Sequence, residues 1–338
     1  MRGMSEMSEM SNERKMRQAG YVGALDIGGT KILAGMFDPR GRLVARKRIE
    51  TLAASGAEQV IERVVKVMRE VMDEAGVSID LLAGVGGSVP GPLDSERGVV
   101  IFSPNLGWRD VPLVAMLEER LGAPVKIEDD ARCAALGEAR YGAARGARNA
   151  VYVTISTGIG GGVIIDGRIY RGSHGFAGEV GHMTLEENGP PCSCGNSGCF
   201  ESLASGTAIA ARARQAVLHG DETILARFRD EPERLTAEQV VPAAAAGDEV
   251  AIRILETAGD YIGIGLAAVA AAFDPEAIVL GGGVVRESGL LLQRARASFA
   301  ARALYPLGSL VRVLSAELGD DSALWGAAAF MNEQVAHV

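Results

Sequence analysis

The chain has few cysteines and few aromatic side chains. Only four of its 338 residues are cysteine, and phenylalanine, tryptophan and tyrosine together make up 5%. So low an aromatic content argues against base stacking as the main mode of ligand binding. Apolar residues still make up 48% and charged residues 23%, which is the composition of an ordinary soluble globular protein.

An excess of basic residues is also absent. The formal net charge is −9 and the pI is about 5.2, which argues against nucleic acid or an anionic membrane as a general partner. The apolar run at 261–273 has thirteen residues, the length of a buried core helix rather than of a membrane span. Residues 1–19 lack the apolar core of a signal peptide, and we expect a disordered tail there. We therefore expect a cytoplasmic protein, in which thiols stay reduced.

Three of the four cysteines nevertheless lie close together. Cys192, Cys194 and Cys199 follow His182 in a Gly-rich stretch. In a reducing compartment, such a cluster indicates a metal site rather than disulfides. Three thiolates and one imidazole form a closed set suited to structural Zn²⁺, with no position left for a reactive water; three free thiols in a loop are the alternative. Cys133 lies elsewhere, on the apolar face of a predicted helix, and is expected in the core.

The chain reads as two related halves. Residues 21–38 predict a strand, a Gly turn and a second strand, and residues 149–172 repeat this order. A helix is predicted over 57–75, where apolar residues recur at helical spacing, and Gly76 ends it. Two halves built in this way suggest a duplicated domain with a cleft between them. Further predicted elements are helices over 112–121, after 130 and over 321–330, strands over 81–90, 124–130 and 277–285, and mostly helix from the cysteine cluster to about 272.

Three Gly-rich turns each follow an apolar strand. They are Asp-Ile-Gly-Gly-Thr-Lys at 26–31, Ser-Thr-Gly-Ile-Gly-Gly-Gly at 156–162 and the triple glycine at 281–283. Backbone N–H groups in such turns can cradle phosphate oxygens, and Asp26 could hold a hydrated Mg²⁺. A tight hairpin is the alternative for the first turn, and a Walker A loop is absent. Together the three turns predict a nucleotide held by loops from both halves.

Two adjacent aspartates end the strand at 124–130. Asp130 could cap the following helix, or it could face the cleft as a general base that deprotonates an alcohol. Side chains alternate along an extended segment, so Asp129 and Asp130 should not point the same way.

These residues together resemble the ROK family of sugar kinases, which have an actin-like, hexokinase-type α/β fold of two domains with a cleft. The matching segments are 26–31, 86–94, 104–108, 128–138, 156–162, 174–182 and 192–202, in the family's order. The resemblance implies a small N-terminal domain of residues 20–130 plus 319–335 and a large domain of residues 131–318 that carries the zinc-binding loop. It also implies ATP-dependent phosphorylation of a hexose, with glucose the expected substrate.

The resemblance assigns a role to each matching residue. Asp130 would be the base, Asp26 would hold Mg²⁺ through water, and His182, Cys192, Cys194 and Cys199 would bind zinc. Gly86, Gly87, Asn105, Asp129, Glu179, His182 and Glu201 would lie at the sugar. Gly28, Gly29, Thr30, Lys31, Thr157 and Gly158 would face the ATP phosphates, and Gly281, Gly282 and Gly283 the adenosine.

One position departs from the family pattern, which usually has Asn where this chain has Asp129. A carboxylate only accepts hydrogen bonds, whereas an amide also donates, so a different sugar could be preferred. N-acetylmannosamine, fructose, mannose and N-acetylglucosamine therefore remain alternatives, as does a donor other than ATP. ROK-type repressors carry an added DNA-binding module, for which we expect the residues before the first strand to be too few. A homodimer or homotetramer is expected from the resemblance alone.

Overall fold

The computed structural model describes residues 20–336; the tail predicted at residues 1–19 lies outside them. The chain divides into two compact units. The first holds the described residues up to Gly137 and from Asp321 onward, and the second holds Glu138–Asp320.

The first unit is built on a five-stranded sheet with the strand order β3-β2-β1-β4-β8. β1, β2 and β3 are antiparallel neighbours, whereas β1, β4 and β8 run parallel, so the carboxyl ends of these three strands share one edge. The elements of this unit are β1 (Tyr21–Ile27), β2 (Lys31–Phe37), β3 (Leu43–Glu50), α2 (Ala57–Ala75), β4 (Leu82–Val89), β5 (Leu93–Asp94), β6 (Val99–Ser103), β7 (Trp108–Val111), α3 (Leu113–Leu121), β8 (Val125–Asp129), α4 (Asp130–Arg140, which continues into the second unit) and α12 (Ser322–Ala336).

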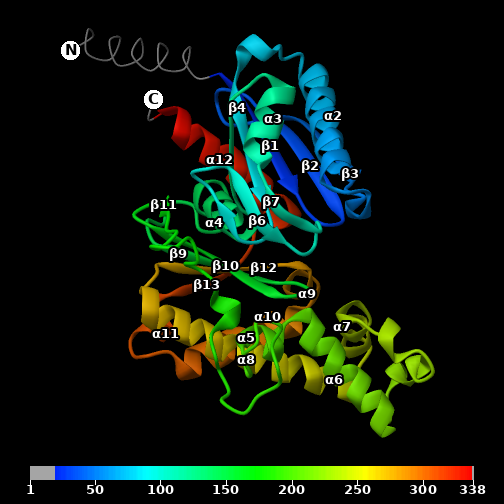
Figure 1. The fold of residues 1–338 in the computed structure, drawn as a ribbon. Coiled ribbons are helices and arrows are strands. Elements are labelled where there is room, and N and C mark those ends of the chain that lie inside the picture. Colours follow the sequence, from blue (N-terminus) through cyan, green and yellow to red (C-terminus); the bar gives the residue numbers. More distant parts are fainter. Residues whose placement is uncertain (1–19, 337–338) are drawn as a thin grey trace. The chain divides into compact units, whose positions relative to one another are not determined.

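Helices cover both faces of this sheet, as Figure 1 shows for α2 and α3 on one side and α12 on the other. The sequence dictates this arrangement because alternate strand residues point to opposite faces. In β1, Ala24 packs with α12, and Ile27 packs with α2 and α3. The predicted helix over 57–75 is confirmed as α2, and Gly76 ends it in the left-handed conformation (φ 65°) with its N–H bonded to Asp73 and Met72 carbonyls.

The second unit repeats the same plan. Its sheet has the order β11-β10-β9-β12-β13, with β9 and β10 antiparallel and β9, β12 and β13 parallel. The predicted repetition is therefore confirmed strand by strand. The elements of this unit are β9 (Ala150–Ile155), β10 (Ile159–Ile165), β11 (Arg168–Ile169), α5 (Phe200–Ala204), α6 (Gly206–His219), α7 (Ala237–Ala245), α8 (Glu249–Phe273), β12 (Ala277–Gly281), α9 (Gly283–Glu287), α10 (Gly289–Arg302), α11 (Leu307–Leu310) and β13 (Arg312–Ser315).

The long helix α8 lies at the centre of the second unit's core. It is the one helix among residues 20–336 that is long and apolar enough to cross a membrane by length and composition. Its apolar residues, such as Ile262 and Leu266, are fully buried against α5, α6, α7 and α10. Its hydrophobicity is thus explained by packing within this unit.

Candidate functional site

The acidic end of β8 is fixed by the start of helix α4. The helix begins at Asp130, and Asp129 Oδ1 accepts the N–H groups of Ala131 and Arg132, both at 3.1 Å. Asp129 is therefore the N-cap, and the alternative that placed Asp130 there is wrong. The helix starts one residue earlier than a cap at Asp130 requires, and it follows directly on Asp129, the last residue of β8, which still pairs with β4. Asp130 lies in the first turn of the helix, and its Oδ1 accepts the neighbouring N–H of Ala131 at 2.7 Å.

A buried ion pair between Glu128 and Arg132 lies next to these two aspartates. Glu128 is fully buried, and its Oε1 accepts from Arg132 Nη1 and from the N–H of Asp129, both at 3.0 Å. Because Arg132 is paired with Glu128, its positive charge only partly stabilises the ionised form of the neighbouring Asp129. Burial and then the negative charge of Asp130 raise the pKa of Asp129 well above its usual value, although Arg132 acts in the opposite direction.

Asp26 lies at the end of β1, on the same sheet edge as Asp129. Ser88 Oγ, near the end of the adjacent strand β4, donates to Asp26 Oδ1 at 3.0 Å. Burial and then Asp130 raise the pKa of Asp26 to about 7, against the opposing effects of Ser88 and Lys31. A divalent cation would relieve the repulsion between these neighbouring carboxyls, and oxygen ligands suit Mg²⁺. The residues therefore fit the magnesium predicted at Asp26.

The turn between β1 and β2 packs against the loop that carries Asn105. An added Cβ at Gly29 would lie 2.7 Å from the carbonyl oxygen of Asn105, so only glycine permits this approach. The other end of the turn is closed by the N–H of Gly28, which donates to the carbonyl of Lys31 at 2.9 Å. The structure thus brings the predicted phosphate turn, Gly28 to Lys31, to the predicted sugar residue Asn105. Sequence reasoning missed the small sheet β5-β6-β7 that presents Asn105.

Gly86 and Gly87 lie inside β4 and serve packing. A Cβ at Gly86 would approach the carbonyl oxygen of Ala327 in α12 to 2.0 Å, and one at Gly87 would meet Ile127 at 3.1 Å. Their contact with a sugar stays a prediction.

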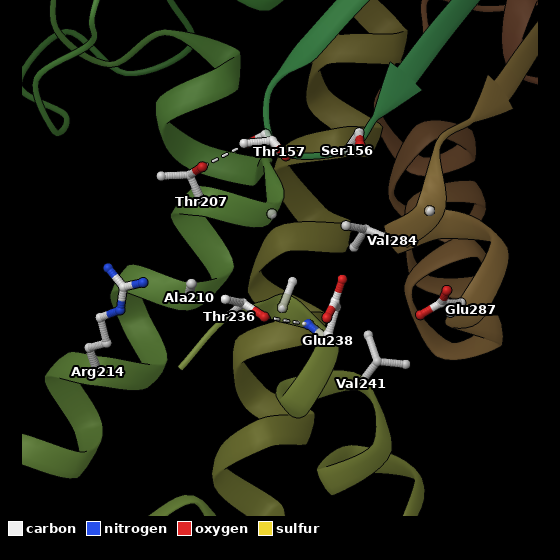
Figure 2. Close-up of a pocket in the computed structure, with 13 residues that line it drawn as sticks. Ser156, Thr157, Thr207, Ala210, Arg214, Thr236, Glu238, Val241, Val284 and Glu287 are labelled. Carbon is white, nitrogen blue, oxygen red and sulfur yellow. Dashed lines mark hydrogen bonds between the residues drawn. The ribbon is translucent and has the colours of Figure 1, made fainter. Parts of the chain in front are cut away.

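The second unit contains a pocket of about 300 Å³ at the edge where β9 and β12 end. Figure 2 shows α6, α7 and α9 around it, with the Ser156–Thr157 turn at its upper end. The carbonyl of Thr157 accepts from Thr207 Oγ1 at 2.8 Å, and the carbonyl of Ser156 accepts the N–H of Gly206 at 2.8 Å, so the start of α6 holds the turn in place. A volume of this size lies within the range of small-molecule sites.

The three predicted adenosine glycines have different roles around this pocket. Gly283 lines it and is the first residue of α9. Gly282 has φ 91°, which a residue with a side chain rarely adopts, and Gly281 packs against the hydroxyl of Tyr152. Sequence reasoning missed Arg214, Glu238 and Glu287, which line the pocket from three helices (Figure 2). No local pattern marks them, because only the packing of α6, α7 and α9 brings them together.

The predicted zinc ligands are gathered in one cluster. The candidate donor atoms of His182, Cys192, Cys194 and Cys199 all lie within 4.8 Å of one another. Cys194 Sγ lies 3.7 Å from Cys199 Sγ, and Cys192 Sγ lies 3.8 Å from His182 Nδ1. A tetrahedral ion with metal–sulfur bonds of about 2.3 Å separates its sulfurs by about 3.8 Å. The donor set and its spacing therefore fit structural zinc, with Nδ1 of His182 on the metal side.

The pKa values of these thiols reflect a mutual repulsion of the thiolates that a bound cation would relieve. Burial and the neighbouring Cys192 and Cys194 raise the pKa of the Cys199 thiol to about 12. A hydrogen bond from the backbone of Asn196 lowers the pKa of the Cys194 thiol. A divalent ion would remove the repulsion among three thiolates, and binding would release protons. Cys133, by contrast, is fully buried between β1 and α12, as predicted.

Glu201 connects the end of the metal-binding loop to the second Gly turn. Its Oε2 accepts the N–H of Ile159 at 2.9 Å, and an added Cβ at Gly158 would approach the same oxygen to 2.3 Å. Glu179, also predicted at the sugar, is exposed and directly precedes the short 3₁₀ turn Val180–His182. The structure therefore joins Glu179, His182 and Glu201 through one loop, while their contact with a sugar stays a prediction.

Comparison with known proteins gives consistent matches along nearly the whole chain. The sequence model of the ROK family matches residues 22–334. The chain is 36% identical to a glucokinase of Halalkalibacterium halodurans over 93% of this chain and 95% of that protein. It is also 32% identical to a xylose repressor of Bacillus subtilis, over 92% of this chain and 76% of the repressor.

Two solved structures have the same fold. A ROK hexokinase from Thermus thermophilus superposes with a TM-score of 0.79, at 37% identity, over 94% of this chain and all of that one. A ROK glucokinase from Streptomyces griseus, in complex with glucose and AMPPNP, gives a TM-score of 0.79 at 34% identity, over 93% of this chain and 100% of that one. The predicted actin-like, hexokinase-type fold is thereby confirmed.

Proposed function

This chain belongs to the ROK family, and from that premise we propose that it transfers the terminal phosphoryl group of ATP to a hydroxyl of a hexose, with glucose as the preferred acceptor. The main support is its 34% identity over 93% of its length to a relative that was crystallised with glucose and an ATP analogue. The chain also retains an aspartate in the first turn of α4, at the sheet edge where ligands of open α/β sheets bind.

Asp130 is the general base in this proposal. It takes the proton of the attacking sugar hydroxyl, while Asp129 and the Glu128–Arg132 pair hold the start of α4 in place. Asp26 is the residue that would hold hydrated Mg²⁺. That ion would supply charge neutralisation on the phosphates, and Lys31 would add to it from the first turn.

The nucleotide occupies the pocket of the second unit. Thr157 and Gly158 lie toward its phosphates, and Gly281 to Gly283 toward its adenosine. The apolar wall of Ala210, Val241 and Val284 suits a base, and Thr157 and Thr207 supply hydroxyl groups beside it.

The residues proposed for the sugar are Glu179, His182 and Glu201 in the second unit and Asn105, Gly86, Gly87 and Asp129 in the first. His182, Cys192, Cys194 and Cys199 would hold a structural zinc, and a bond to it would fix the imidazole so that its second nitrogen can face a hydroxyl. We further propose that a sugar and ATP are its partners in the cytoplasm. The predicted homodimer or homotetramer stays a prediction.

A kinase for another hexose is the second candidate, and Asp129 is the observation that favours it. One carboxyl oxygen caps α4, so the other must meet any ligand there as a carboxyl rather than as an amide. A sugar-responsive regulator is a weaker candidate, motivated by the likeness to the xylose repressor.

A coupled ADP-release assay with ATP and Mg²⁺ tests the proposal. The panel is glucose, mannose, fructose, N-acetylglucosamine and N-acetylmannosamine. A kcat/KM for glucose well above the others supports the first candidate. A preference for another sugar assigns the chain to the second candidate, and Asp129→Asn then tests whether that position sets the preference. If none of the sugars is phosphorylated although the protein binds one of them, the result would support the regulator.

A further inference from the structure

Three side chains outside the predicted sites form a row that connects the metal-binding loop to α8 and α6. We define this loop as residues 182–199. Tyr261 of α8 donates its hydroxyl to Oε2 of Glu186, in the loop, at 2.7 Å. The guanidinium of Arg212, on α6, lies over the Tyr261 ring with its carbon 5.7 Å from the ring centroid. A cation, an aromatic ring and a carboxylate are thus aligned across three separate segments.

The backbone of Glu186 is tied to the end of the loop that carries the last ligand. The N–H groups of Leu185 and Glu186 donate to the carbonyl of Gly198 at 2.8 and 3.3 Å, and the carbonyl of Glu186 accepts from Gly189 at 3.1 Å. Gly198 precedes Cys199 directly, and any Cβ there would overlap the carbonyl of Glu186. Displacement of Glu186 would therefore move the chain at a metal ligand.

The loop and the residue that follows it contact α8 at two points, one helical turn apart. Near Cys199, the ring of Phe200 packs so closely on Gly265 that an added Cβ would lie 2.6 Å from it. Near the other end, Glu186 reaches Tyr261, four residues earlier on the same face of the helix. The two contacts together set the position of the loop along α8.

Arg212 supplies the positive charge of the row. Its Nη1 is buried and has no hydrogen-bond partner among residues 20–336, so the ring of Tyr261 and the nearby Glu186 are what compensate its charge. Burial lowers the pKa of Arg212, and the bond to Glu186 raises the pKa of Tyr261. Removing Glu186 would leave this partly buried cation with less compensation for its charge. The charge of Arg212 therefore favours the position of the loop in which Glu186 bonds to Tyr261.

We propose that Glu186, Tyr261 and Arg212 form a positioning clip that holds the metal-binding loop against α6 and α8 and keeps its four ligands together. His182 begins this loop and Glu179 lies three residues before it, so the clip also sets the affinity for the sugar. Its effect on sugar affinity rests on the proposed function, whereas its effect on metal retention does not.

The test compares metal release from the purified zinc-loaded protein. Tyr261→Phe removes the hydroxyl and keeps the ring under Arg212, Glu186→Ala removes the acceptor, and Glu186→Gln keeps an uncharged acceptor. Tyr305→Phe is the matched control, because Tyr305 is 91% exposed. The rate of zinc transfer to excess chromogenic chelator is measured for each, together with kcat and KM for the sugar.

We expect Tyr261→Phe and Glu186→Ala to release zinc about tenfold faster, as for the loss of a hydrogen bond to a charged group. Glu186→Gln should lie between these and wild type, and the double variant should be no faster than either single one. KM for the sugar should rise about threefold with kcat unchanged, since only positioning is lost.

Zinc release at the wild-type rate in Tyr261→Phe would overturn the clip, as would an equal acceleration in Tyr305→Phe or a wild-type protein that contains no zinc. Faster release with an unchanged KM would overturn the sugar half of the proposal. Faster release in a protein that phosphorylates no sugar would leave the clip standing and reject the proposed function.

Discussion

The two sheets have the same strand order and the same pairing directions, yet different side chains lie at the ends of their parallel strands. In the first unit, Asp26 is the next-to-last residue of β1, and β8 ends in Asp129, which Asp130 follows. In the second unit, β9 is followed by Ser156 and Thr157, and β12 by glycines. The same backbone plan thus carries carboxyls suited to proton transfer and magnesium in one unit, and hydroxyls and open backbone suited to a nucleotide in the other.

The comparison also extends to how each unit holds its site. In the first unit, Asp129 and Asp130 depend on local contacts, namely a helix cap and an ion pair four residues apart. The second unit depends on a long loop, and it gathers that loop through metal ligands and contacts with α8. Substitutions should therefore affect proton chemistry in the first unit and ligand affinity in the second.

Asp130→Asn should give the largest effect. Loss of a general base lowers turnover by about two to four orders of magnitude, and we expect kcat to fall by that amount while the sugar still binds. Steady-state ADP release measures kcat, and calorimetric titration measures sugar binding. A kcat near that of wild type would reject the assignment of the base to the first unit.

Cys194→Ala and Cys133→Ala separate the metal site of the second unit from the core of the first. Cys194→Ala should reduce bound zinc from one ion per chain to almost none and raise KM for the sugar, because the loop loses its closed set of ligands. Cys133→Ala changes a fully buried side chain that is no ligand, so its zinc content should equal that of wild type. Metal analysis of both variants checks this, and zinc loss in Cys133→Ala would contradict it.

The sequence was sufficient for those parts of this comparison that depend on local pattern. Periodic apolar residues and Gly76 define α2, and the repeated Gly turns reveal the duplication. Short strands such as Leu93–Asp94 have too few residues for a detectable alternation, so the sheet that presents Asn105 was missed.

Contacts distant in sequence were also beyond prediction. The candidate zinc ligands lie within one segment, so spacing alone could indicate the cluster that the structure shows. Glu238 and Glu287 reach the pocket only because α7 and α9 pack together, and Tyr261 meets Glu186 across 75 residues. The cap at Asp129 was assigned one residue too late, because strand and helix meet there without a turn residue between them.

The carboxyls of the first unit should make its stability depend on pH. The native state retains a proton on Asp26 up to about pH 7, whereas the unfolded chain releases it near pH 4. The free energy of unfolding of the wild type should therefore fall as the pH rises from about 4 to about 7, and the loss should be complete above that pH. Asp26 accounts for at most about 4 kcal/mol of this loss. Asp26→Asn should show a smaller decline between pH 5 and pH 8 in urea titrations without Mg²⁺. Glu70→Gln is the control, because the hydrogen bond from Lys47 lowers the pKa of Glu70 and keeps it ionised across this range. Equal slopes for Asp26→Asn and wild type would show that Asp26 does not titrate there.

The smallest effect tests how closely helices approach in each unit. In the first unit, Gly326 of α12 lies so near α4 that an added Cβ would overlap the carbonyl oxygen of Cys133. In the second unit, Gly289 begins α10 with open space around it. Gly326→Ala should therefore lower the free energy of unfolding by about 1–3 kcal/mol through overpacking, whereas Gly289→Ala should be neutral or slightly stabilising because alanine favours the helix. Urea unfolding of both variants measures the difference, and equal stabilities would mean that α12 can shift away from α4 without cost.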